Sequence, residues 1–266
     1  HCISSAASDV YKRQASDFIR FNHARVRQAG QVQQVYATLA LYQGERHGDF
    51  ELALSGVIDD DRPRLDQALQ QLRAVLPTLA DDPYLRLNRE AWRSETAAGE
   101  AAQHSEAAIA QINEAAAGLD LVGFYAAGPQ YQGFASSWGA FGWHVASSFN
   151  FEFSLFHDNG QAVKSSYAGE QWGAQAFARK LAFAREQLEH LGKPAHKLKP
   201  GAYRAYLTPA ALEELFGLFA WGFSAEALAT GGSALQRLFA GSASLSDKVT
   251  LDERIEGGLA PAFTRE

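Results

Sequence analysis

Cysteine and methionine are almost absent from this sequence. Its 266 residues include one cysteine, Cys2, and no methionine. A single cysteine excludes a disulfide within the chain, which is typical of proteins from reducing compartments. No signal peptide is recognisable, and no apolar run approaches the roughly 20 residues that a membrane-spanning helix requires. We therefore expect a cytoplasmic protein that does not partner with a membrane.

Basic charge is also scarce. The 24 lysines and arginines are outnumbered by 30 aspartates and glutamates, which gives a net charge of −6 and an isoelectric point near 5.8. Nucleic-acid binding usually requires a dense basic face, so no nucleic-acid partner is expected. Hydrophobic residues make up 47% and charged residues 20% of the chain, which is typical of a globular protein with a substantial core.

Both ends of the sequence lack the features of natural termini. Position 1 is not methionine, and the opening "HCISSAASDVYKRQ" resembles a stretch that recurs at the edges of conceptual translations. We set residues 1–14 aside as a non-native leader. The closing "GGLAPAFTRE" has neither a helix cap nor a helical pattern. We expect the sequence to be a piece of a longer protein.

Two long stretches have the composition and alternation of strands. Residues 17–57 contain short β-rich runs separated by glycine-containing loops, with a break at Gly30, which is typical of an antiparallel meander. Further strands are expected from residue 119 onward, with a Gly-Pro turn in "AGPQ" and a hairpin signal at Asn159-Gly160. "AYRAYL", residues 202–207, is also interpreted as a strand.

Apolar residues at helical spacing predict helices between and after these strands. Leu65, Leu69, Leu72 and Leu76 form one stripe after three aspartates, and Pro77 ends that helix. The other predicted helices are 101–117, with Ile109 and Ile112 inward and Gly118 at its end, 171–191, with Phe177 and Leu181 inward, and one starting at Thr208-Pro209.

The alternation of strands and helices predicts an α+β fold with antiparallel sheets flanked by helices. We place the N-terminal domain at 15–196 and the start of a second, truncated domain at 197–266. The boundary lies in "KPAHKLKPG", residues 193–201, which is basic and contains proline.

The hairpin around Asn159-Gly160 determines which side chains share a face. A two-residue loop would pair residue 158 with 161 and place Glu152 opposite Tyr167. Strand alternation then places four apolar side chains on one face, where we expect them to pack under a helix. These residues are Phe149, Phe151, Phe153 and Leu155.

The opposite face of the same hairpin is predicted to be polar. It would carry Asn150, Glu152, Ser154 and Tyr167, and the predicted pairing puts Lys164 on the other face, away from Glu152. Antiparallel sheets commonly keep one face in water, so the pattern by itself favours a solvated face here.

No stretch of the sequence has the pattern of a self-contained active site. Zinc requires three or four converging ligands, and His144, Glu152 and His157 could converge only through tertiary contacts. His144 is interpreted as a sheet residue with a polar partner. Ser137 lies in a near match to the nucleophile elbow, but another strand follows where a helix is required. Gly231-Gly232-Ser233 lacks the lysine of a phosphate loop. We assign no catalytic and no metal-binding residue to this chain.

An ordered set of motifs resembles the TldD/PmbA family. The motifs are "RVRQAG", "DDPY", "GFYAAGPQYQGFASSWG", "WH", "FSLF", "AVKSSYAGEQW" and "PGAYRAYLTPAALEELF". Members of this family are cytoplasmic bacterial and archaeal proteins, often labelled modulators of DNA gyrase or TldD-related metallopeptidases. The resemblance implies an N-terminal α+β domain, a β-rich C-terminal domain, and a long cleft for unfolded peptide. In such a cleft the polar face with Asn150, Glu152, Ser154 and Tyr167 could contact a peptide or a partner.

The resemblance also implies where zinc would be bound. In the peptidase-type subunit of the family, His-Glu-x-x-x-His lies on a helix that follows a strand similar to "AYRAYLTP". Here that helix reads "PAALEELFGLFAWG" and contains no histidine. The chain thus resembles the subunit type without zinc, and it would have no cofactor of its own.

The function implied is that of a subunit in a proteolytic complex that acts on peptides or unfolded proteins. Its partner would be a metal-bearing TldD-like subunit in a heterodimer, with a homodimer as the other possible assembly. The alternative is a peptide-binding or assembly module without a role in hydrolysis. Direct binding to DNA or gyrase is disfavoured by the acidic charge.

Overall fold

The computed structural model describes residues 6–97, 105–252, 254 and 258–259. Within these residues the chain forms two compact units. The first extends to Ala195 and includes Gly258 and Leu259, and the second is His196–Arg254. The division between them falls within the basic, proline-containing connection. No described helix is long and apolar enough to cross a membrane.

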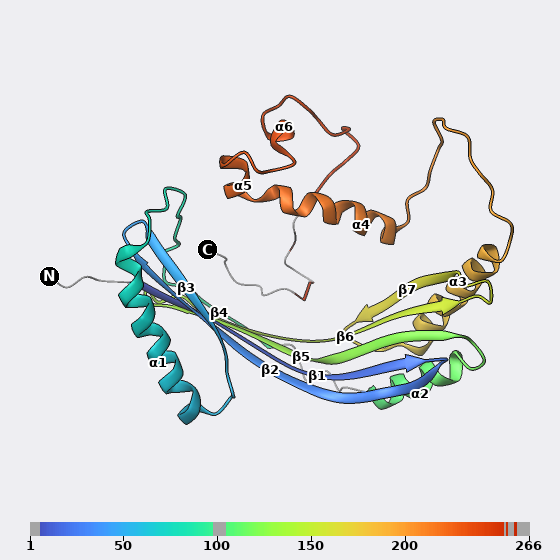
Figure 1. Ribbon diagram of the computed structural model, residues 1–266, viewed down its shortest axis with the longest axis horizontal. Helices are drawn as coiled ribbons and strands as arrows, with labels where there is room; N and C mark the ends of the chain where they lie inside the picture. The colour runs from blue at the N-terminus through green and yellow to red at the C-terminus, as the bar shows by residue number, and fades with distance from the viewer. Residues whose placement is uncertain (1–5, 98–104, 253, 255–257, 260–266) are drawn as a thin grey trace. The chain divides into compact units, whose positions relative to one another are not determined.

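The first unit is built on one seven-stranded sheet with the order β3-β2-β1-β5-β6-β4, in which β7 also pairs with β6. Four long strands form its centre (Figure 1): β1 (Ala6–Asn22), β2 (Arg25–Gln43), β5 (Leu121–Ser136) and β6 (Phe141–Phe156). The shorter strands are β3 (Arg46–Ala53), β4 (Arg93–Ala97) and β7 (Ala162–Gly169). All pairs are antiparallel except β4 with β6. The predicted α+β class is confirmed.

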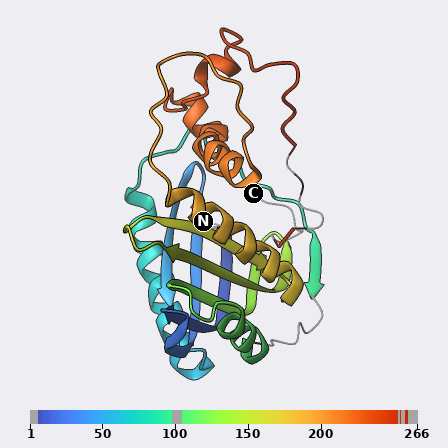
Figure 2. The same ribbon diagram turned by 90° about the vertical axis from the view of Figure 1, so that its right-hand side faces the viewer.

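Helices pack on one face of this sheet. They are α1 (Ile58–Val75), continued by the 3-10 turn η1 (Leu76–Thr78), α2 (Ser105–Ala115) and α3 (Ala174–Leu191). Figure 1 shows α1 at one end of the long strands and α2 and α3 at the other, and Figure 2 shows α3 running obliquely across the strands. The apolar periodicity of the sequence located all three helices.

The main core lies between the sheet and the helices α2 and α3. The side chains of Phe151, Phe153 and Phe177 are at most 2% exposed, and they meet ring to ring, with centroids 5.1–6.0 Å apart. A smaller cluster of Leu41, Leu72 and Leu76 joins α1 and η1 to β2. The predicted phenylalanine face under a helix is confirmed, and we call this side of the sheet the apolar face.

The first hairpin turns at two residues that carry no turn signal. Strands β1 and β2 are joined by His23 and Ala24, which have φ angles of 48° and 54°. Two positive φ values are typical of a type I′ turn, which usually selects Asn or Gly. The expected break at Gly30 is wrong: Gly30 lies inside β2 opposite Phe18, whose ring occupies the space above it.

Gly128 and Pro129 are also inside a strand, so the expected turn in "AGPQ" is wrong. Both lie in β5, which pairs without interruption with β6. On the β1 side, Gln14 pairs with Gln130 and Asp17 with Ala127, and the register shows no pair at the two positions between them. Pro129 has no N–H to donate, and Gly128 allows the two backbones to approach closely.

Residues 6–14, set aside as a leader, extend β1. They pair with β2 from Ala6 opposite Tyr42 to Gln14 opposite Gln34. Pairing with β5 begins at Ser8, opposite Ser136. This segment therefore contributes to the centre of the sheet.

The second unit contains helices and, within its described residues, no strand. Its elements are α4 (Pro209–Ala220), the 3-10 turn η2 (Trp221–Phe223), α5 (Ala225–Ala229) and α6 (Gln236–Phe239). The strand expected at residues 202–207 is wrong. That segment is irregular and exposed, with Tyr206 86% exposed, and an isolated strand without a paired neighbour is not stable.

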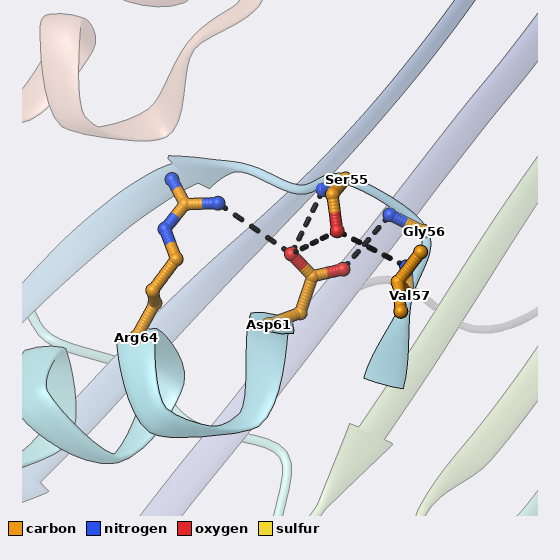
Figure 3. Close-up of polar contacts among 5 residues, drawn as sticks. All are labelled: Ser55, Gly56, Val57, Asp61 and Arg64. Carbon is orange, nitrogen blue, oxygen red and sulfur yellow. Dashed lines mark hydrogen bonds and ion pairs between the residues drawn. The ribbon is translucent and has the colours of Figure 1, made fainter. Parts of the chain in front are cut away.

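Asp61 closes the loop between β3 and α1. Its carboxylate accepts hydrogen bonds from the backbone N–H groups of Ser55 and Gly56, both at 2.8 Å, and from the Ser55 hydroxyl at 3.0 Å (Figure 3). Arg64 lies 3.5 Å away on the next turn. The hydrogen bond from the Ser55 backbone is the main cause that lowers the Asp61 pKa below 3.8, although burial of the carboxylate acts in the opposite direction.

We expect Asp61→Asn to lower the Tm at neutral pH more than Asp60→Asn. Both substitutions remove one charge from the first turn of α1, but Asp60 is exposed and only Asp61 holds the loop amides. Because folding lowers the Asp61 pKa, its contribution to stability is present above pH 3.8 and is lost as the pH falls through the folded pKa. Thermal unfolding followed by circular dichroism from pH 7 to pH 3 should show the two Tm values converging. Equal Tm values at pH 7 would contradict this role.

Candidate functional site

The face of the sheet opposite the helices is polar and partly aromatic. We call it the open face and define it by the side chains that alternate with those of the apolar face. At the α2 and α3 end it consists of Arg20, Val122, Phe124, Asn150, Glu152, Ser154, Lys164 and Ser166. Most of these side chains are exposed, so this face is available to a ligand.

Three of the four residues predicted as peptide or partner contacts lie on the open face. Asn150 and Glu152 are exposed and Ser154 is half-buried. Glu152 pairs with Ser166, and Ser154 pairs with Lys164. These three positions therefore share one surface, as the alternation of β6 predicted.

Tyr167 lies on the apolar face, so its predicted placement beside Glu152 is wrong. It pairs with Phe151, and its ring packs against Phe149 and Trp172 with centroids 4.9 and 5.1 Å away. Its hydroxyl accepts a hydrogen bond of 3.1 Å from the backbone N–H of Gly173, at the start of α3. Tyr167 thus anchors the start of α3 and lies on the other side of the sheet from Glu152.

The loop between β6 and β7 explains this error. Its last pair is His157 with Gln161, linked by a 2.8 Å bond, and Gly160 donates to the His157 carbonyl, also at 2.8 Å. Only Gly160 has a positive φ, of 82°, while Asn159 does not, which indicates a three-residue loop with a glycine bulge. The pairing of β7 with β6 is therefore shifted by one residue from the predicted register. A shift of one residue turns every side chain of β7 to the other face of the sheet.

The same shift brings Glu152 and Lys164 together. Their side chains form an ion pair at 3.6 Å on the open face, where the two-residue loop predicted opposite faces. Both side chains are more than half exposed, so the pair contributes little to stability. The pair does place one positive and one negative charge side by side on the open face.

A hollow of about 500 Å³ lies on the open face around this ion pair. Basic side chains line it on several strands: Arg20 on β1, Arg27 on β2 and Lys164 on β7. The guanidinium of Arg20 lies 5.9 Å from the ring centroid of Phe124, on β5. Glu152 is the acidic residue of the lining. Sequence reasoning missed Arg20 and Arg27, because only the register of β1, β2 and β5 brings them to Glu152.

A second region of the open face, near the middle of the long strands, is rich in side-chain amides. Gln14 pairs with Gln34 on one side and with Gln130 on the other, and Gln132 lies two residues further along β5. They line a smaller hollow of about 170 Å³ together with Lys12 and Tyr36. An amide side chain donates and accepts hydrogen bonds, so this row matches the groups of a peptide main chain.

His144 holds a main-chain carbonyl beside this row. It pairs with Gln132 and is 8% exposed. Its Nε2 lies 3.1 Å from the carbonyl oxygen of Leu259, and its Nδ1 lies 3.0 Å from the hydroxyl of Thr96. A carbonyl oxygen only accepts, so the Nε2 of a neutral His144 carries the proton and Nδ1 accepts from Thr96. The interpretation of His144 as a sheet residue with a polar partner is confirmed.

The described residues do not assemble a metal site. No three His, Cys, Asp or Glu side chains among them lie close enough to hold a metal ion. His144 and Glu152 lie eight residues apart on β6, and His157 lies in the following loop. Helix α4, which corresponds to the zinc helix in the resemblance, offers only Glu213 and Glu214, both exposed. Its residues therefore do not fit a zinc ion.

The serine and glycine candidates have structural roles. Ser137 lies in the tight turn between β5 and β6, and a strand follows it, so no nucleophile elbow forms. Ser233 is buried, donates to the Gly222 carbonyl at 2.7 Å and accepts from the Leu235 N–H at 3.0 Å. It therefore closes a loop of the second unit, where both its donor and its acceptor are used.

Comparison with known proteins identifies solved structures with this fold. No family model and no curated protein matches the sequence. A candidate modulator of a DNA gyrase from Thermotoga maritima superimposes with a TM-score of 0.62 at 12% identity, covering 87% of this chain and 55% of that chain. TldE from Thermococcus kodakarensis gives 0.61 at 10% identity, covering 86% and 54%. A candidate modulator of DNA gyrase from Bacteroides thetaiotaomicron gives 0.59 at 14% identity, covering 87% and 56%.

These likenesses confirm the TldD/PmbA resemblance at the level of the fold. The present chain spans a little over half the length of each of the three structures. At identities of 10–14% the shared feature is the backbone arrangement, and the activity of the whole proteins is a separate question.

Proposed function

We propose that this chain is the zinc-free subunit of a TldD/PmbA-type peptidase assembly in the cytoplasm. The open face of its sheet holds peptides or unfolded segments, and a metal-bearing partner subunit completes their hydrolysis. The single observation that carries this proposal is His144, which on the open face binds the main-chain carbonyl of Leu259 beside a row of glutamine amides.

Main-chain recognition suits a subunit that handles unfolded protein. Every peptide unit presents one N–H donor and one carbonyl acceptor, whatever its side chains are. The amides of Gln14, Gln34, Gln130 and Gln132 offer both kinds of partner on adjacent strands. A peptide lying across the open face could therefore be held without strong sequence selection, as a proteolytic role on varied substrates requires.

The composition of α4 supports a division of labour between subunits. A catalytic zinc site needs three protein ligands and an open position for water. Helix α4 reads "PAALEELFGLFA" and offers no imidazole. Zinc and the water it activates would then belong to the partner, a metal-bearing TldD-like subunit.

An assembly module without a role in hydrolysis is the second candidate. Strand β3 is the outermost strand next to β2, so one of its backbone edges has no neighbouring strand within the described sheet. An open strand edge can accept an extended segment from another chain. Such a module would bind a partner or a peptide and leave its rate of cleavage unchanged.

We expect the purified 266-residue chain to bind no stoichiometric zinc and to leave unfolded casein intact. Mixed with a homologue that carries His-Glu-x-x-x-His, it should raise the cleavage rate above that of the homologue alone. Elemental analysis after zinc loading and a gel-based cleavage assay measure both results. Stoichiometric zinc with cleavage by the lone chain would refute the proposal, whereas binding to the homologue at an unchanged rate would favour the assembly module.

A further inference from the structure

We infer that the hollow around Arg20, Arg27 and Lys164 is a subsite that selects an acidic side chain of a bound peptide, next to an apolar one. This inference rests on the proposed function, because it concerns the same open face and the peptide held there. It adds a chemical preference that main-chain recognition alone does not provide.

The charges in the hollow do not balance. Arg20, Arg27 and Lys164 face one carboxylate, that of Glu152, which already pairs with Lys164 at 3.6 Å. Within the described part of the chain, neither arginine forms an ion pair with an acidic side chain. An excess of two positive charges therefore faces the hollow of a protein whose net charge is −6. An anionic ligand would balance it.

A β-bulge directs Arg27 into this hollow. Arg20 pairs with Gln28, but Phe21 pairs with Val26, so Arg27 is the extra residue of β2. Without this shift Arg27 would lie opposite Phe21, whose buried side chain is on the apolar face. Bulges of this kind re-aim a side chain and are common next to binding sites. The bulge thus adds a second guanidinium to the surface where Arg20 lies.

The apolar part of the lining indicates what accompanies the anion. Phe124 and Val122 are 42% and 40% exposed, which is high for large apolar side chains on a sheet. Arg20 lies over the Phe124 ring at 5.9 Å, and Phe18 stacks on the same ring at 6.3 Å. An arginine placed over a ring keeps its N–H edge directed outward. A ligand that fits has a carboxylate for the guanidinium groups and an apolar group for the ring.

An acidic peptide fits this surface better than a free anion. Guanidinium groups bind carboxylates through two parallel hydrogen bonds. The hollow, about 500 Å³, is within the range of about 300–1,000 Å³ of ligand sites, and it is larger than a single carboxylate requires. Consecutive glutamate and leucine residues of a peptide would supply both groups at once.

The test compares two fluorescein-labelled, C-terminally amidated peptides that differ only in a central Glu-Leu or Gln-Leu pair. Fluorescence anisotropy on the 266-residue chain should show the Glu peptide binding about threefold to fivefold more tightly, as expected for partly exposed charge pairs. Arg27→Gln should remove most of this difference. Arg25→Gln is the matched control, since Arg25 lies on the same strand but outside the lining of this hollow. Its affinities should stay within about twofold of the unsubstituted chain.

Raising the salt concentration should weaken the preference for the Glu peptide, because exposed charges are screened. Circular dichroism melting of Arg27→Gln establishes that the variant is folded before its affinity is compared. N-acetylglutamate amide serves as competitor and should displace the peptide only weakly.

The outcomes separate the inference from the proposed function. Equal affinity for both peptides, unchanged in Arg27→Gln, would overturn the acidic subsite. The proposed binding of peptides to the open face would not be affected by this result. No binding of either peptide would overturn both. Displacement by N-acetylglutamate amide at the affinity of the peptide itself would show an anion site and overturn the assignment to a peptide.

Discussion

Gly128→Ala is expected to destabilise the chain by roughly 3 kcal/mol or more, beyond the usual range for one added methyl group. A Cβ at this position would lie 2.0 Å from the carbonyl oxygen of Ala15 and 2.8 Å from the Cα of Ser16. Both atoms belong to the backbone of β1, the strand next to β5 at the centre of the sheet. Neither can move without displacing the strands beside it.

This expectation follows from the gap in the ladder between β1 and β5. Pairing stops at Gly128 and Pro129 and resumes in the same register on either side. The two strands approach each other closely there, and this requires a residue without a side chain. The gap lies between the two regions of the open face, so a change there should also disturb their relative position on the sheet.

Gly217→Ala provides the matched control for this substitution. Gly217 lies within α4, has no atom within 4 Å of an added Cβ, and does not have a positive φ. Alanine should be neutral there or stabilising by about 0.5–1 kcal/mol, because it lowers the entropy of the unfolded chain. Denaturant unfolding followed by circular dichroism measures both variants. A Gly128→Ala variant as stable as Gly217→Ala would contradict the close approach of β1 and β5.

Phe151→Ala should cost about 3–5 kcal/mol, the range for a phenylalanine removed from a tight core. The side chain is fully buried, and its ring lies 5.1–6.4 Å, centroid to centroid, from five aromatic neighbours. These neighbours are Phe21, Tyr125, Phe153, Trp172 and Phe177. They come from the sheet, from α3 and from the segment before α3. The cavity that the substitution leaves therefore cannot be closed by a movement of one element.

Phe124→Ala on the open face is the control for this prediction. Phe124 lies on the adjacent strand opposite Glu152, and its ring is 42% exposed. Its loss should lower the free energy of unfolding by about 1 kcal/mol or less, because little of its surface leaves water on folding. Urea unfolding monitored by tryptophan fluorescence compares the two variants. Equal losses would mean that the two faces of the sheet are not packed differently.

The two phenylalanine variants also separate stability from binding. Phe151→Ala should lower stability and leave the open face intact wherever the chain remains folded. Phe124→Ala should leave the fold intact and weaken the binding of peptides with an apolar residue next to the acidic one. The reason is that the Phe124 ring lines the hollow and lies beneath the guanidinium of Arg20.

Much of the fold could be predicted from local pattern. The helices α1 and α3 follow from leucine and phenylalanine spacing, and the buried face of β6 follows from strict alternation. These signals are local because a helix or strand repeats over a few residues, whatever the rest of the chain does. The turns were harder, since His23-Ala24 carries none of the residues that usually mark a hairpin.

The candidate site could be predicted only in part, because register depends on details that composition does not show. Asn150, Glu152 and Ser154 were placed together correctly from one strand alone. Tyr167 was misplaced because one extra loop residue, allowed by the positive φ of Gly160, reversed the faces of β7. Arg27 was missed because the bulge that re-aims it arises between two strands.

The sequence by itself determined the helices α1, α2 and α3, the apolar face of β6 and the absence of a histidine motif in α4. These follow from residue identity and from periodicities of two and 3.6, which need no knowledge of distant partners. Only the tertiary structure decided that Arg20, Arg27, Glu152 and Lys164 meet around one hollow and that His144 meets a main-chain carbonyl. The physical reason is that residues far apart in sequence become neighbours only when strands pair in a particular register. A single bulge or one extra loop residue changes that register.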